Sequence, residues 1–245
     1  MSPQSLFSII TVCLNEKRNI RRTCESILAQ SFTDFEWIVI DGGSTDGTLD
    51  VLTEYKSQIS CLISEPDAGI YNAMNKGIRY AKGEYLIFMN GGDCFSNPNV
   101  LLTVSKAPKV DFIWGDVFKR QKKKIKNKLS RHYLIKHGFP HQACYFKKEL
   151  FIKHGGYNES LLISADYELI IRFIYKYKAS YFYIPKVLAL FNRDGISCNK
   201  NLRITRKLEA HEIRKKYFSI WYLLSYQAIK WEYRKILIRL QESKK

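Results

Sequence analysis

Short apolar runs alternate with polar, glycine-containing turns along the first 90 positions of the chain. The segments between the runs carry apolar residues at helical spacing, as Ile70, Met74 and Ile78 do. This pattern predicts strands at 7–14, 35–40, 61–64 and 85–89, and helices at 16–30, 49–55 and 70–81. Strands separated by helices form an α/β fold, with a doubly wound and mainly parallel sheet.

The stretch 35–48 organises this part of the chain. Its apolar run contains β-branched residues, which is typical of a strand covered on both faces, and it stops at Asp41 and Gly42. A short polar side chain among Ser44, Thr45 and Asp46 can cap the helix that follows. Ligands of open α/β sheets bind outside the carboxyl ends of the strands. The turn is therefore either part of a ligand site or an ordinary connection between a strand and a helix.

Polar residues follow all four predicted strands at the point where each strand ends. They are Asn15, Glu16, Asp41, Glu65, Asp67, Asn90 and Asp93. Because the strands are predicted to be parallel, these side chains should converge on one rim of the sheet. The chain lacks a G-x-G-x-x-G motif after the first strand and lacks a P-loop lysine motif. An acidic rim can bind a phosphate through Mg²⁺ or Mn²⁺, because carboxylate oxygens are suitable ligands for these cations.

Composition adds a strong positive charge to this picture. The 245 residues carry a net charge of +17, which indicates a negative partner such as nucleic acid, anionic lipid or a phosphorylated substrate. The six cysteines are scattered, which argues against a zinc site or a disulfide framework and favours reduced core residues. The polar start of the chain and the lack of a long uncharged apolar segment predict a cytosolic protein without a signal peptide or membrane-spanning helix.

The second half of the chain is less regular. A strand is predicted at 111–117, followed by a run with seven basic residues at 119–128 that is typical of a solvated loop. A helix with apolar residues at helical spacing is predicted to start at Asp166. In the tail, 201–245, basic residues lie beside an apolar helical face. This face consists of Phe218, Trp221, Tyr222, Ile229, Tyr233, Ile236, Leu237 and Leu240, and it suits either an anionic membrane surface or a packing interface.

Four ordered segments together resemble the family 2 glycosyltransferases. They are 10–15, the Asp-Gly-Gly-Ser-Thr-Asp-Gly-Thr motif at 41–48, the Glu-Pro-Asp-Ala-Gly-Ile-Tyr-Asn motif that opens 65–77, and 83–93. The resemblance covers roughly residues 5–200 and is nearest to bacterial enzymes of O-antigen, capsule or exopolysaccharide assembly. It implies a GT-A fold, a nucleotide-sugar donor, a divalent cation held by a D-x-D-like motif, and inversion at the anomeric carbon.

The resemblance also assigns roles to individual residues. Asp93 matches the metal ligand, with Mn²⁺ or Mg²⁺ as the cofactor, while Asn90 and Gly92 stand where many relatives have further aspartates. Gly42 replaces the second residue of an aspartate pair that reads the uracil ring, so base reading falls to Asp41, Asp67 or the main chain. The donor-binding residues expected on this basis are Thr11, Asn15, Glu16, Asp41, Gly42, Glu65, Asp67, Asn75, Lys76, Asn90, Gly92 and His141.

Asp166 matches the family's catalytic base. An inverting transfer needs a base that takes the proton of the acceptor hydroxyl, and a carboxylate at the start of a helix has a fixed position for this task. The alternative role for Asp166 is that of an acidic residue in the first turn of a helix, which stabilises the helix. Residues 139–146 resemble the family's His-Gln strand, and the alternative role of His141 within it is structural.

The sequence therefore predicts a GT-A catalytic domain at 1–200 and a basic helical extension at 201–245. The expected reaction moves a hexose or N-acetylhexosamine from a UDP-sugar to a polyprenyl-diphosphate-linked saccharide. The extension would hold the enzyme on the inner face of the cytoplasmic membrane or form a homodimer. One alternative is a non-catalytic GT-A-like scaffold, which metal-dependent donor hydrolysis would distinguish from an enzyme. The other is a nucleic-acid-binding protein, which salt-dependent DNA retention without sugar-nucleotide binding would favour.

Overall fold

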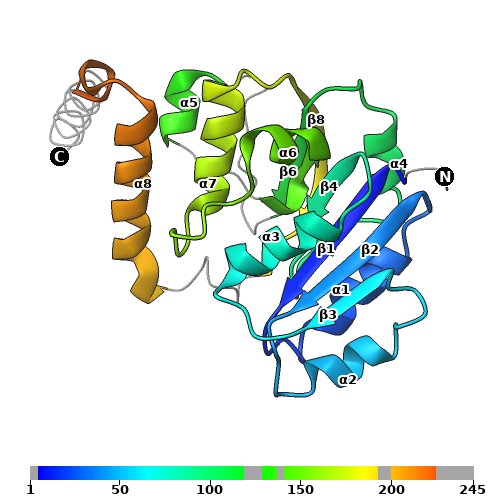
Figure 1. The fold of residues 1–245 in the computed structure, drawn as a ribbon. Helices are drawn as coiled ribbons and strands as arrows, with labels where there is room; N and C mark the ends of the chain where they lie inside the picture. The colour runs from blue at the N-terminus through cyan, green and yellow to red at the C-terminus, as the bar shows by residue number, and fades with distance from the viewer. Residues whose placement is uncertain (1–4, 119–128, 137–140, 193–199, 225–245) are drawn as a thin grey trace, which may run out of the picture.

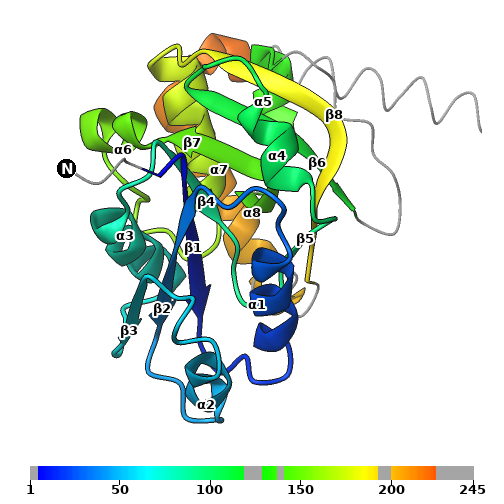
Figure 2. The same ribbon diagram turned by 90° about the vertical axis from the view of Figure 1, so that its right-hand side faces the viewer.

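The computed structural model describes residues 5–118, 129–136, 141–192 and 200–224. Within these ranges the strands form one eight-stranded sheet in the order β3-β2-β1-β4-β7-β6-β8-β5. The basic run at 119–128, the start of the predicted strand 139–146, Cys198 and residues 225–245 of the tail lie outside the described residues. Figures 1 and 2 show the sheet between two groups of helices.

The first half of the sheet is parallel, as the sequence predicts. Strands β1 (Phe7–Cys13), β2 (Phe35–Asp41), β3 (Cys61–Ser64) and β4 (Tyr85–Phe88) pair in parallel. Helices α1 (Ile20–Leu28), α2 (Thr48–Thr53) and α3 (Ile70–Tyr80) connect them. Asp46 accepts hydrogen bonds from the backbone N–H and the hydroxyl of Thr48, so it is the residue that stabilises the start of α2.

The second half of the sheet is largely antiparallel. Strand β7 (Cys144–Lys147) pairs antiparallel with β4 and with β6 (Phe112–Phe118), and β8 (Tyr181–Leu190) pairs parallel with β6. Strand β5 (Cys94–Phe95) pairs antiparallel with β8. The short helices here are α4 (Val100–Ser105), α5 (Arg131–Lys136), a 3-10 turn at His141–Ala143 and α6 (Lys148–His154).

Alternate residues of the strands enter two separate cores, one on each face of the sheet. Ile9 belongs to the core that contains residues of α1, α2 and α4, whereas Ile10 belongs to the core that contains residues of α3, α6 and α7 (Ala165–Ile170). Helix α3 lies so close to β1 that a side chain at Gly77 would collide with Ile10. Cys13, Cys24, Cys94 and Cys144 are buried, in agreement with their predicted place in the core.

The C-terminal part of the described chain packs on the face that carries α3. Helix α7 (Ala165–Ile170) continues as a π-helix (Ile171–Lys176), and α8 (Arg203–Tyr217) follows after a 3-10 turn at Lys200–Leu202. Ile213, Phe218 and Leu223 join the core on that face. Up to Leu224, therefore, residues of the predicted extension contribute to this core.

Candidate active site

A cavity of about 860 Å³ lies at the carboxyl ends of β1 and β4. Its walls come from these strand ends, from α3, from the start of α7 and from α8. In Figure 1, α7 lies between α8 and the strands β1 to β3. Six predicted site residues line the cavity, namely Glu16, Asp67, Asn90, Asp93, His141 and Asp166.

Asp93 is held in place by hydrogen bonds to both of its carboxylate oxygens. Its Oδ1 accepts from the backbone N–H of Asn192 at 2.7 Å, and its Oδ2 accepts from Gln142 Nε2 at 2.9 Å. The residue is only 3% exposed, and burial raises the pKa of its carboxyl despite the opposing effects of His141 and these hydrogen bonds. A bound cation would favour the charged form of this carboxylate.

His141 connects the neighbourhood of Asp93 to Asp166. Its Nε2 lies 3.0 Å from Asn90 Nδ2, and its Nδ1 lies 3.8 Å from Asp166 Oδ2. The second distance is too long for a hydrogen bond but short enough for an electrostatic interaction. Asp166 sits in the first turn of α7, and its side chain is 25% exposed toward the cavity that it lines.

The consecutive residues His141 and Gln142 therefore lie against two of the acidic groups of the site, Asp166 and Asp93. Gln142 donates to Asp93, and His141 faces Asp166. The 3-10 turn at His141–Ala143, directly before β7, fixes both side chains relative to the sheet. This arrangement places a candidate metal ligand and a candidate base in one cavity.

The residues around Asp93 fit a cation that is held by one carboxylate together with substrate oxygens. Among the described residues, no three His, Cys, Asp or Glu side chains form a metal-binding group. Mg²⁺ needs only one or two protein carboxylates when substrate phosphates supply further ligands. Asn90 Oδ1 and Gln142 Oε1 are buried oxygens in the cavity wall without a hydrogen-bond partner, and amide oxygens are hard ligands of the same kind.

Asp41 and Thr11 lie outside the cavity. Asp41 is fully buried, and its carboxylate accepts hydrogen bonds from Ser44 and from the Ser64 hydroxyl. Thr11 is also fully buried, and its Oγ1 accepts from Trp37 Nε1 at 3.0 Å. Neither residue lines the cavity. Asp41 organises the β2–α2 turn, and Thr11 belongs to the core.

Four other predicted donor residues have structural contacts and do not line the cavity. Lys76 forms an ion pair with Glu65 at 2.6 Å and donates to the Pro66 carbonyl, which fixes the β3–α3 loop. Asn75 bonds the backbone of Tyr157 as donor and as acceptor. Asn15 adopts a left-handed conformation (φ 54°), and its Oδ1 accepts from the Thr45 N–H. These residues shape the rim of the sheet.

Both glycines that replace family aspartates lie against a side chain from another segment. A Cβ atom at Gly42 would lie 2.5 Å from Asp67 Oδ2, and one at Gly92 would lie 2.1 Å from Asn192 Nδ2. Gly92 also has a left-handed φ of +88°, which is unfavourable for other residues. Asp67 and Asn192 therefore fill the space that side chains at these positions would need.

Helix α8 contributes a part of the site that the sequence does not predict. Arg206, Lys207 and Arg214 line the cavity, although they belong to the segment assigned to the extension. The only sequence signal for them is the basic character of the tail. Their position depends on the packing of α8 against α7, which periodicity alone does not specify.

This fold and this cavity define a GT-A glycosyltransferase, and comparisons with known proteins agree. A model of the glycosyl transferase family 2 matches residues 8–170. An uncharacterised glycosyltransferase of Mycobacterium tuberculosis is 35% identical over 184 residues, which cover 70% of each protein. A PGL/p-HBAD biosynthesis glycosyltransferase of Mycobacterium bovis is 30% identical over 200 residues, which cover 78% of each. The chain belongs to glycosyltransferase family 2.

Solved structures share the same fold. TarS residues 1–349 of S. aureus superpose with a TM-score of 0.66 at 18% identity, covering 85% of this chain and 65% of that one. A mannosyltransferase of Pyrobaculum calidifontis, solved with GDP-Man and Mn²⁺, has a TM-score of 0.65 at 19% identity and covers 84% of this chain and 61% of that one. This chain thus spans less than two thirds of each of these two solved chains.

Proposed function

We propose that this family 2 enzyme is an inverting glycosyltransferase with Asp166 as its catalytic base. The observation that carries the proposal is the shared cavity in which His141 and Gln142 contact Asp166 and Asp93. The substrates are a UDP-sugar that donates a hexose or N-acetylhexosamine, and a saccharide linked to a lipid diphosphate. TarS structures with UDP and UDP-GlcNAc support the donor class, and the PGL/p-HBAD biosynthesis relative supports a lipid-linked acceptor.

In this mechanism Asp166 takes the proton of the acceptor hydroxyl while that oxygen attacks the anomeric carbon. His141 Nδ1 faces the carboxylate that performs this step at 3.8 Å, and the Tyr167 N–H donates to its other oxygen. Asp93 would bind Mn²⁺ or Mg²⁺, which, when bound, stabilises the negative charge of the leaving diphosphate. Gln142 and the Asn192 backbone keep the Asp93 carboxylate in one orientation. Asp67, which occupies the space beside Gly42, is the residue of the rim that we assign to the nucleotide base.

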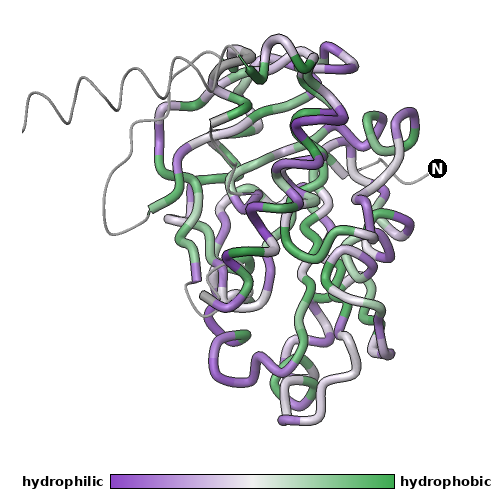
Figure 3. Tube along the Cα trace, turned by 90° about the vertical axis from the view of Figure 1, so that its left-hand side faces the viewer, coloured by the Kyte–Doolittle hydropathy of each residue, from purple (hydrophilic) through white to green (hydrophobic). Residues whose placement is uncertain are grey.

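The proposed location of the enzyme is the inner face of the cytoplasmic membrane. In the part of the chain that the structure describes, no helix has both the length and the apolar character needed to span a bilayer. Ile204, Leu208 and Trp221 are 71%, 62% and 78% exposed on and just after α8, among several basic residues. Figure 3 shows the side of the molecule on which this helix lies, with hydrophilic and hydrophobic segments mixed along it. Exposed apolar side chains beside cations suit an anionic membrane surface.

A donor hydrolysis assay tests the proposed function. The full chain is incubated with a panel of UDP- and GDP-sugars, with Mn²⁺ or with EDTA, and the released nucleotide is measured. We expect metal-dependent release from at least one UDP-sugar, and faster release when a lipid-diphosphate-linked sugar is added. Absence of release and of nucleotide binding by the folded protein would contradict the proposal and favour a scaffold. Salt-dependent DNA retention under the same conditions would favour a nucleic-acid-binding protein.

A further inference from the structure

The charges in the cavity wall are separated into two groups. Glu16 and Asp93 come from or follow the ends of β1 and β4, and Asp67 lies at the start of the segment that leads into α3. Among the described lining residues, every Lys and Arg comes from α8, namely Arg206, Lys207 and Arg214. One helix therefore supplies a cationic wall, defined here as these three residues, opposite the acidic rim.

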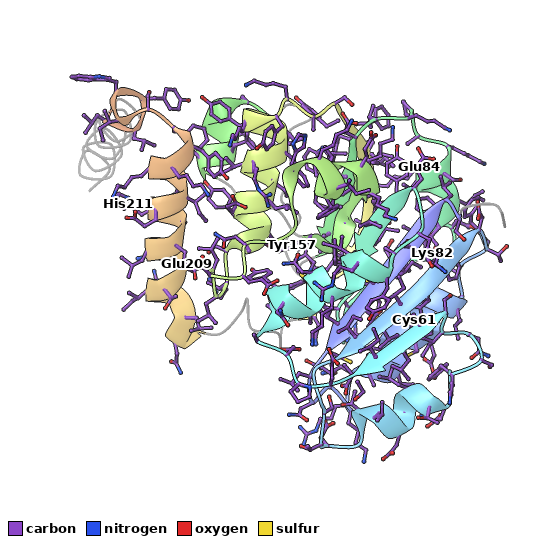
Figure 4. All side chains as sticks on the ribbon, viewed as in Figure 1. Cys61, Lys82, Glu84, Tyr157, Glu209 and His211 are labelled. Carbon is purple, nitrogen blue, oxygen red and sulfur yellow. The ribbon has the colours of Figure 1, made fainter. Side chains whose placement is uncertain are left out.

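The two acidic side chains of α8 bind groups elsewhere. Glu209 accepts hydrogen bonds from the backbone N–H groups of Leu162 and Ile163 at 2.6 and 3.2 Å. Glu212 forms an ion pair with Lys215 at 3.2 Å. Figure 4 labels Glu209 on α8 and shows His211 on the outward side of the same helix. Both carboxylates of α8 are thus bound to groups outside the cationic wall.

Two further features indicate that the cationic wall is built to meet an anion. Arg214 is fixed by hydrogen bonds from its Nε to the Ile135 carbonyl at 3.0 Å and to Tyr167 Oη at 3.3 Å. Arg206 and Lys207 lie within the first five residues of α8, near a helix end where positive side chains are unfavourable because the end is itself positive. A phosphate in the cavity offsets this repulsion.

The cationic wall and the candidate base line the same cavity. Asp166 stands in the first turn of α7, and Arg206, Lys207 and Arg214 of α8 line the cavity with it. A donor diphosphate bound through a cation at Asp93 would lie at the ends of β1 and β4. An acceptor whose hydroxyl reaches Asp166 would then extend toward α8.

We propose that Arg206 and Lys207, with Arg214 beside them, bind the diphosphate group of the acceptor. This inference rests on the proposed function and adds the residues that recognise the acceptor's charge. On this proposal the acceptor binds only if it carries the diphosphate, because that group accepts two or three charge-assisted hydrogen bonds from the cationic wall. A neutral acceptor with the same sugar lacks these contacts.

The test uses citronellyl diphosphate, a short and soluble isoprenoid diphosphate, as the probe. The full chain is first saturated with UDP and Mn²⁺, so that the donor side is occupied, and the probe is then titrated calorimetrically. We expect wild type to bind citronellyl diphosphate but not citronellol. The double variant Arg206→Gln/Lys207→Gln should bind the diphosphate at least tenfold more weakly, with UDP affinity within twofold of wild type.

Arg203→Gln/Lys215→Gln is the matched control, because it removes the same charge from the same helix outside the cavity. We expect its affinity for the probe to stay within twofold of wild type, with circular dichroism confirming the fold of each variant. Equal probe binding by the Arg206/Lys207 variant, or absence of binding by UDP-loaded wild type, would overturn the inference. A parallel loss of UDP affinity would also overturn it, because the cations would then serve the donor. Failure of wild type to bind UDP at all would instead contradict the proposed function.

Discussion

At the scale of single residues, the site depends on how two carboxylates are held. Asp93 is buried with both oxygens in hydrogen bonds, whereas Asp166 is partly exposed and faces His141 at 3.8 Å. A metal ligand benefits from a fixed position, and a base needs access to the hydroxyl that it deprotonates. The two environments match the two proposed roles.

Asp166→Asn tests the proposed base. The substitution keeps the size of the side chain but removes its ability to accept the proton, so we expect kcat to fall by about 10²–10⁴-fold. The affinity for the nucleotide should change little, because Asp166 lies beyond the donor side of the cavity. Steady-state kinetics and calorimetric nucleotide binding measure the two effects, and a turnover within a few-fold of wild type would contradict the assignment.

Asp93→Asn tests the proposed metal ligand. The amide cannot supply the negative charge that attracts a divalent cation, so transfer should be lost while the fold is retained. Titration of Mn²⁺ followed by electron paramagnetic resonance, in the presence of UDP, gives a measurement that is independent of turnover. Asp34→Asn is the control, because Asp34 is exposed in the loop before β2 and does not line the cavity. Normal turnover of Asp93→Asn, or full activity in EDTA, would refute the metal role.

The residue scale also shows where sequence reasoning reaches its limit. Asp41 and Asp93 both follow predicted strands, so the hydrophobic pattern does not distinguish their positions. In the structure the hydroxyls of Ser44 and Ser64 bind Asp41 inside the rim, while Asp93 reaches the cavity. These hydroxyl contacts come from separate segments, and the apolar periodicity of the chain does not specify them.

At the scale of elements, the contact between α7 and α8 positions both the base and the cationic wall. Glu168 is buried in α7, where it contacts Arg172 Nε at 3.2 Å and Lys216 Nζ at 3.7 Å, and it accepts a hydrogen bond from the Tyr217 hydroxyl. Burial, and then the hydrogen bond to the Glu168 carboxylate, raise the pKa of Tyr217, so its phenol stays protonated and donates. This cluster holds the start of α7 and the end of α8 in a fixed relation.

Glu168→Gln should therefore destabilise the protein. Removing the charge leaves Arg172 partly buried without its carboxylate, a loss that typically costs about 3–5 kcal/mol in buried ion pairs. Chemical denaturation measures the free energy of unfolding. Glu212→Gln is the control, because its pair with Lys215 is exposed and should contribute less than about 1 kcal/mol. Equal stability of the two variants would show that the α7–α8 cluster is not a main contact.

The elements also differ in how well the sequence predicts them. The first four strands and the helices between them were predictable, because each strand is a continuous apolar run and each helix has one apolar face. The sequence places α8 in a basic extension, because Lys and Arg dominate this segment. In the structure Ile213 is the one buried residue of α8. The hydrogen bonds of Glu209 and Arg214 join distant segments and leave no periodic signal.

At the scale of the whole molecule, α8 is proposed to face the cavity on one side and the membrane on another. We predict that the full chain sediments with vesicles of anionic phospholipid at low salt and is largely released at high salt, because each Lys or Arg near such a surface contributes about 1 kcal/mol. Leu208→Ser/Trp221→Ser should weaken this binding severalfold, since both side chains are exposed.

Ile152→Ser/Leu28→Ser is the control for vesicle binding, because these exposed apolar residues lie on α6 and α1. Point substitutions are preferable to a truncation at residue 199, which would remove Ile213 and Phe218 from the core. If both double variants bind vesicles as strongly as wild type, the exposed residues of α8 and its continuation serve another purpose, such as an interface between two copies of the chain.

The packing of α8 against the domain has a consequence for the biosynthesis of the enzyme. The cavity takes side chains from Val12 to Arg214, so residues made early in translation and residues made late meet in one site. Chains generally begin to fold from the N-terminal part while synthesis continues. The strands β1 to β4 can form before the ribosome has translated α8, but the wall that α8 contributes to the cavity is still missing at that stage. A nascent chain in which the strand ends of β1 to β4 have formed therefore completes the cavity only when α8 has packed against the domain.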